Sequence, residues 1–137
     1  MTASEILHCQ NEIVTTLANA IQRRWRFVAV NIEIDVIEGE QTENCITLSY
    51  TRHLWKLLRH SEKLPYQCYD QFSRLRILMT AEQARPWSSS TLVLDTDGNY
   101  RFAFQYGTPS RLNGIHDDGS MLVDFNPKAF LRASSAN

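Results

Sequence analysis

The chain has 137 residues, of which 43% are hydrophobic and 21% charged, and this composition is typical of a folded protein and excludes wholesale disorder. Its formal net charge of −1 excludes the marked positive excess with which proteins coat nucleic acid or bind membranes through basic surfaces. The length suits one domain covering residues 1–137.

The cysteines and the first residues predict the compartment. Cys9, Cys45 and Cys68 are widely spaced and form no CxxC pair, so neither a disulfide framework nor a zinc site is indicated. The segment MTASEILHCQNE lacks the basic-then-apolar pattern of a secretory signal, and no apolar run approaches the length of a membrane span. We therefore expect a cytoplasmic protein with reduced thiols, without a cofactor and without a membrane or nucleic-acid partner.

The first two predicted elements are a helix and a strand. Residues 3–22 carry apolar side chains at intervals of seven and four, which fall on one side of a helix: Ile6, Ile13, Leu17 and Ile21. From residue 27 to residue 37 apolar and polar residues alternate, a pattern that predicts a strand because successive side chains point to opposite faces.

A second strand is predicted over residues 44–50, with Ile46, Leu48 and Tyr50 facing inward. The link at residues 38–41 is too short for a crossover, so the two strands are expected to form an antiparallel hairpin. Residues 51–63 show no clear period and are compatible with a longer strand or with a short helix.

Trp55 lies in this segment among several basic residues. An exposed tryptophan with arginine neighbours would form a contact patch for a partner, since Trp and Arg are enriched at binding hot spots. A core tryptophan flanked by long basic side chains is the favoured alternative.

The next predicted elements are a helix and a second hairpin. Pro65 suits the first turn of a helix that is expected to end before Pro86, and its apolar side recurs at three- and four-residue steps: Tyr69, Phe72, Leu75, Leu78 and Met79. After Trp87, a strand with Leu92 and Leu94 on one face meets an Asp-Gly turn. An aromatic strand follows, with one face formed by Tyr100, Phe102, Phe104 and Tyr106.

The end of the chain is less regular. Residues 121–125 are a candidate fifth strand, and Asn126-Pro127 has the chemistry of a helix start. Together these elements predict an α+β fold, an antiparallel sheet of four or five strands with two main helices, in the order α-β-β-α-β-β plus a short C-terminal element.

The order of elements from Glu5 to Tyr106 resembles that of the YezG-like immunity proteins. The resemblance rests also on a Trp ahead of a Ser/Thr-rich strand of Leu and Val, an Asp-Gly turn and an aromatic strand ending near Tyr106. These proteins are antitoxins of bacterial polymorphic-toxin and contact-dependent inhibition systems. The resemblance implies that the chain binds the C-terminal domain of a cognate toxin, frequently a nuclease, and neutralises it by occlusion without catalysis. After Gly107 the chain departs from the family pattern.

No arrangement of residues specifies catalysis, and we expect neither catalytic residues nor a metal. The nearest candidate is His116-Asp117-Asp118, because one imidazole and two carboxylates are the kind of set that a metal-assisted hydrolase needs. Turn signals at Gly114 and Gly119 instead favour a polar loop. A small metal-dependent hydrolase centred on these three residues and a generic protein-interaction adaptor are the alternatives to an immunity protein.

Acidic turns are the other predicted partner contacts. If the toxin has a basic cleft, complementary charge would speed association with acidic loops of this chain. The candidates, beside Trp55, are Glu38, Glu40, Glu43, Asp95, Asp97, Asp117 and Asp118.

Overall fold

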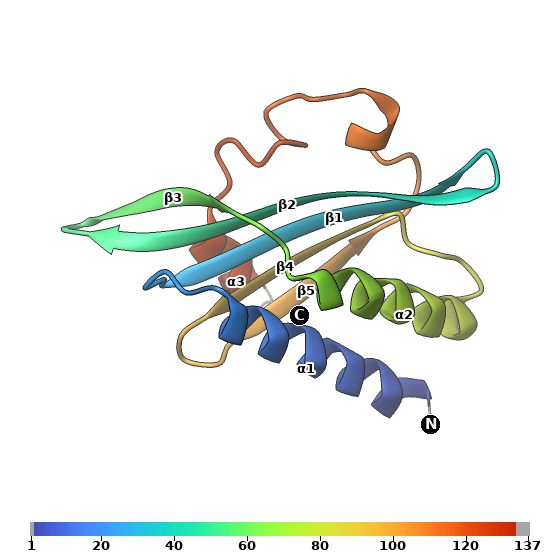
Figure 1. Ribbon diagram of the computed structural model, residues 1–137, viewed down its shortest axis with the longest axis horizontal. Helices are drawn as coiled ribbons and strands as arrows, with labels where there is room; N and C mark the ends of the chain where they lie inside the picture. Colours follow the sequence, from blue (N-terminus) through green and yellow to red (C-terminus); the bar gives the residue numbers. More distant parts are fainter. Residues whose placement is uncertain (1, 134–137) are drawn as a thin grey trace.

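A five-stranded antiparallel sheet in the order β3-β2-β1-β4-β5 organises the computed structural model, which describes residues 2–133 (Figure 1). The helices are α1 (Thr2–Ala20), α2 (Tyr66–Gln83), the 3-10 turn η1 (Arg111–Asn113) and α3 (Pro127–Ala133). The strands are β1 (Phe27–Ile37), β2 (Glu40–His53), β3 (Lys56–Glu62), β4 (Ser89–Asp95) and β5 (Tyr100–Gln105). The predicted α+β class, the antiparallel sheet and the two main helices are confirmed.

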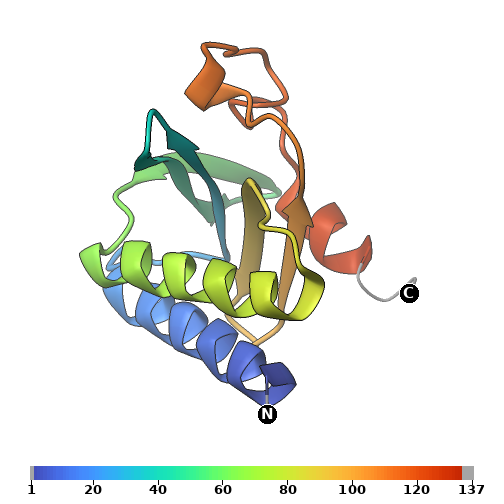
Figure 2. The same cartoon turned by 90° about the vertical axis from the view of Figure 1, so that its right-hand side faces the viewer.

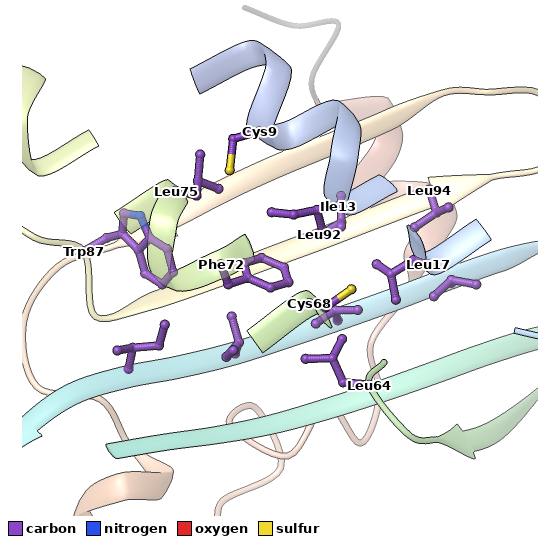
Figure 3. Close-up of a cluster of buried hydrophobic side chains, with 14 of the residues drawn as sticks. Cys9, Ile13, Leu17, Leu64, Cys68, Phe72, Leu75, Trp87, Leu92 and Leu94 are labelled. Carbon is purple, nitrogen blue, oxygen red and sulfur yellow. The ribbon is translucent and has the colours of Figure 1, made fainter. Parts of the chain in front are cut away.

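Helices α1 and α2 lie side by side on one face of the sheet, and α3 lies on the other face (Figure 2). Beneath α1 and α2, alternate residues of β1 form a core with both helices: Val28, Val30, Ile32 and Ile34 with Ile13, Leu17, Cys68, Phe72 and Leu75 (Figure 3). The predicted aromatic strand covers the β5 side of this core, where the rings of Phe72 and Phe102 meet edge to face at 6.3 Å. Trp87 is fully buried there.

A second, smaller core lies on the opposite face of the sheet. Leu48 pairs with Ala29 and Tyr50 with Phe27, so these residues point away from the helices α1 and α2. They form a cluster with Val93 and Leu122. Leu48 and Tyr50 are therefore buried, as predicted, but in a different core from Val28 and Val30, and β1 is covered on both faces.

The fifth strand is β3, and the candidate strand at residues 121–125 is wrong. Local hydrogen bonds close turns there, from the Met121 N–H to the Asp117 oxygen at 3.0 Å and from the Val123 N–H to the Asp118 oxygen at 2.9 Å. Leu122 has a positive φ of 57°, which is incompatible with an extended strand. The segment instead belongs to a long loop, residues 106–126, called here the late loop.

Candidate functional site

The hairpin of β2 and β3 extends past the end of the rest of the sheet (Figure 1). The register explains this, because β1 begins at Phe27 opposite Tyr50, while β2 and β3 continue to pair as far as His53 and Lys56. Residues 51–58, called here the projecting hairpin, therefore have a strand neighbour on one side only. Leu54 and Trp55 form its two-residue turn.

The turn of the projecting hairpin exposes two large apolar side chains. Trp55 is 81% exposed and Leu54 is 77% exposed, so the favoured expectation of a core tryptophan is wrong. Leu54 also has a positive φ of 57°, a conformation that glycine and asparagine adopt much more readily than leucine. The turn thus combines backbone strain with the exposure of apolar surface.

Apolar side chains also lie on both faces of the projecting hairpin. Leu57 pairs with Arg52 and Leu58 pairs with Thr51, and because consecutive residues of a strand alternate, the two leucines point to opposite faces. Both are exposed. The hairpin therefore offers apolar contacts at its turn and on each side.

The charge of the projecting hairpin is positive. From Tyr50 to Ser61 the sequence holds Arg52, Lys56 and Arg59, two histidines and no acidic residue. The Lys56 ammonium lies 4.9 Å from the centre of the Trp55 ring, a cation–π contact that keeps a positive charge beside the indole.

Polar contacts hold the base of the hairpin. A guanidinium nitrogen of Arg59 donates to the main-chain oxygens of Leu122 at 2.7 Å and Val123 at 2.8 Å, in the late loop. On the other face Glu62 accepts hydrogen bonds from Ser49 at 2.6 Å and from Arg23 at 3.1 Å. Burial by itself raises the pKa of Glu62, but these two hydrogen bonds, together with the nearby charges of Arg23 and His60, outweigh burial and lower the pKa.

The opposite end of β2 is acidic. Glu38 and Glu40 are exposed at the β1–β2 turn, and Glu43 follows on β2. Partial burial raises the pKa of Glu43, and the nearby charge of Asp70 on α2 raises it further, so these carboxylates lie close enough to repel one another. We call Glu38, Glu40, Glu43 and Asp70 the acidic end. The net charge of −1 therefore conceals a separation of charge along the 14 residues of β2.

The structure does not bring the predicted acidic turns together. Asp95 pairs with Phe27 at the end of β4, so the β4–β5 turn lies at the same end of the sheet as the projecting hairpin. The Asp95 carboxylate accepts hydrogen bonds from the main-chain N–H groups of Asp97 and Asn99, both at 2.9 Å, which gives it a role in shaping the turn. Arg26 lines the hollow beside Asp95, together with Lys128 and Arg132.

The late loop carries the remaining predicted residues. Asp117 accepts a hydrogen bond from the Ser120 N–H at 2.8 Å, and the bonds with Ser120 lower its pKa. Asp118 and His116 are exposed beside it. Within residues 2–133 no group of three or more His, Cys, Asp or Glu side chains is arranged to hold a metal ion, so the hydrolase alternative gains no support from the geometry.

A buried arginine fixes the late loop to the sheet, and sequence reasoning missed it. Arg111 is 5% exposed, and its guanidinium donates to the side-chain oxygens of Asn31 at 2.8 Å and Asn44 at 2.6 Å. It lies 3.5 Å from the Glu33 carboxylate, which accepts the main-chain N–H groups of Arg111 and Leu112. The only sign of this site in the sequence is that Asn31 and Glu33 are polar residues within the alternating segment 27–37.

A polar cavity of about 730 Å³ lies between the late loop and the sheet. Asn31, Ser89 and Thr91 line it from the sheet side, and Asp117 from the loop side. The Asn31 amide donates to the Ser89 and Thr91 hydroxyls at 3.1 and 2.9 Å, so much of the wall is committed to internal hydrogen bonds. Arg111 and Glu33, which anchor the late loop to the sheet, also line this cavity.

In comparisons with known proteins, neither a family model nor a curated protein matches the chain. No helix among residues 2–133 combines the length and the apolar character needed to cross a membrane.

Proposed function

We propose that this chain is an immunity protein that binds the C-terminal domain of a cognate toxin in the cytoplasm of the producing cell and neutralises it without catalysis. The observation that carries the proposal is the exposure of Leu54 and Trp55 at the turn of the projecting hairpin. The resemblance of the sequence to YezG-like immunity proteins supplies the class of partner.

The turn residues are unfavourable for the isolated chain, which supports a role in binding. Two-residue hairpin turns favour glycine, asparagine or aspartate because these tolerate positive φ. Leu54 tolerates it poorly, and Leu54 and Trp55 both leave apolar surface in water. Local conflicts of this kind concentrate at functional sites, and tryptophan is among the residues that contribute most at protein interfaces.

The acidic end is a competing contact surface. If the toxin is a nuclease with a basic cleft, Glu38, Glu40 and Glu43 are placed to approach it. At about 3.4 Å per residue, Glu40 and His53 at the two ends of β2 lie roughly 45 Å apart. A standard interface covers a patch roughly 30 Å across, so one such interface includes one end of β2 and not both. The apolar anchor favours the projecting hairpin.

Co-expression rescue tests the proposed function. The candidate toxin, which is the C-terminal domain of any large secreted protein encoded beside this gene, is expressed with and without this chain, and surviving cells are counted. The proposal predicts survival only with the chain, together with a stable complex that copurifies. Toxicity that the chain does not relieve contradicts it. A complex that forms without rescue favours the adaptor alternative.

A further inference from the structure

We infer that the partner receives the projecting hairpin in an apolar cleft with an acidic rim, which contacts the hairpin on both faces. The inference rests on the proposed function, because it takes the toxin domain as the partner and describes the surface that the domain must present. It identifies a binding mode, insertion of a hairpin, that the sequence resemblance does not specify.

The shape of the apolar surface indicates a cleft. Leu54 and Trp55 occupy the turn, and Leu57 and Leu58 point to opposite faces just behind it. A flat surface that meets the turn would leave at least one of the two leucines in water, whereas a cleft buries the turn and both faces. Burial of each of these large apolar side chains favours association, because it removes apolar surface from water.

The charge around the apolar residues indicates the rim. Arg52 and Lys56 flank the turn, and among the described residues no carboxylate lies within ion-pair distance of either side chain. Acidic side chains on the partner would meet these cations at the edge of the contact, where they raise the rate of association and fix the orientation. If the toxin is a nuclease, its basic substrate cleft carries the same sign of charge as the projecting hairpin and would repel it.

Contacts at the base of the projecting hairpin fix its conformation before the partner binds. Arg59 is bonded to two main-chain oxygens of the late loop, and the hydroxyl of Thr51 lies 2.8 Å from the His60 ring nitrogen. The Arg59 contacts fix β3 to the late loop on one face of the hairpin base, and the contact of Thr51 with His60 joins β2 to β3 on the other face. A hairpin fixed before binding loses less conformational entropy on association than a flexible loop does.

A second copy of this chain fits the hairpin less well. Pairing of two β3 edges would bring Lys56 and Arg59 of each copy close to the same residues of the other, and basic side chains on an edge strand oppose such pairing. A lipid surface would meet only the turn. Both remain outcomes of the experiment below.

Titration calorimetry of the purified toxin domain with the full chain tests the inference. Trp55→Ala is expected to weaken binding about 30-fold, as for an interface hot spot, and Leu57→Ser and Leu58→Ser about 5-fold each. Arg52→Glu combined with Lys56→Glu is expected to weaken binding and to reverse the effect of added salt. Tyr66→Ala and Ile77→Ser are the matched controls, because both side chains are exposed on α2, at 84% and 69%. Circular dichroism establishes that each variant is folded.

The outcomes separate the inference from the proposed function. Failure of the wild-type chain to bind or rescue contradicts the proposed function. Tight wild-type binding that none of the hairpin substitutions weakens overturns the inference and leaves the proposed function intact. Loss of affinity in Trp55→Ala without loss in Leu57→Ser or Leu58→Ser rules out the two-faced cleft. Trp55-dependent sedimentation with phosphatidylserine vesicles, or Trp55-dependent dimerisation of the free chain, assigns the hairpin to a membrane or to a second copy and also overturns the inference.

Discussion

The Arg111 guanidinium donates to the side-chain oxygen of Asn31 at 2.8 Å, across 80 positions of the sequence. The contact joins the late loop to the central strand β1, and it places Arg111 3.5 Å from the Glu33 carboxylate, with both side chains buried. Arg111→Met would leave Glu33 buried without its counter-charge. We expect this change to destabilise the protein by about 3–5 kcal/mol in urea denaturation, as is typical when one partner of a buried pair is removed.

The exposed Arg24 supplies the control for this measurement, since Arg24→Met removes the same charge at the surface. We expect a change within about 0.5 kcal/mol for that variant. Equal stability of the two variants would show that the contacts of Arg111 with Asn31, Asn44 and Glu33, called here the Arg111 network, contribute little to the fold.

The Arg111 network shows why part of the structure could not be predicted from the sequence. Strand β1 could be predicted with its bounds because apolar residues that face the core of α1 and α2 alternate with residues of the opposite face, where Asn31 and Glu33 contact the late loop. Strand β3 could not, since most of its residues are exposed and no burial imposes a period of two. The contact of Arg111 with Asn31 depends on where the late loop packs against the sheet. That position cannot be predicted from the residues next to Arg111 in the sequence, because Asn31 lies 80 positions away.

For the candidate site too, the sequence predicts which residues are notable but not how they are arranged in space. Trp55 could be singled out from its type and its basic neighbours, but its exposure depends on the difference in length between β1 and β2. The acidic turns could each be located as turns. Their distribution over both ends of the sheet and the late loop follows from strand order, which the sequence pattern does not determine.

Leu54→Gly is expected to stabilise the free protein while weakening its binding. Glycine adopts the positive φ of this position without steric cost, so we expect a gain of about 0.5–1 kcal/mol in the free energy of unfolding. The same change removes an apolar contact from the turn. Thermal denaturation and calorimetry with the toxin domain measure the two effects, and a variant that is less stable than the wild type would show that Leu54 contributes to folding.

The hydrogen bond from Ser49 to Glu62 predicts a dependence of stability on pH. Because the folded protein holds the pKa of Glu62 below its ordinary value of 4.5, the contribution is fully present above that value and is lost as the pH falls through the folded pKa. Ser49→Ala is expected to cost about 1 kcal/mol at pH 7. The difference between the two proteins should shrink in denaturation experiments below pH 4.5, and a difference that is constant down to pH 2 would contradict this assignment.

The cysteines of the helix-side core are expected to be unreactive in the native protein. Burial raises the pKa of Cys45 to about 11 and that of Cys68 to about 12, so little thiolate exists near neutral pH. Iodoacetamide at pH 8 should leave both unlabelled until denaturant is added, as peptide mass spectrometry would detect. Rapid labelling of either residue in the folded protein would show that the core opens there.

Hydrogen–deuterium exchange of the free chain and of its complex with the toxin domain tests most directly which surface binds. Insertion of the projecting hairpin into the toxin domain predicts that slowed exchange on complex formation concentrates in residues 51–59, with residues 34–43 at the acidic end unchanged. Slowed exchange confined to residues 34–43 would instead place the toxin on the acidic end of β2 and overturn insertion of the hairpin.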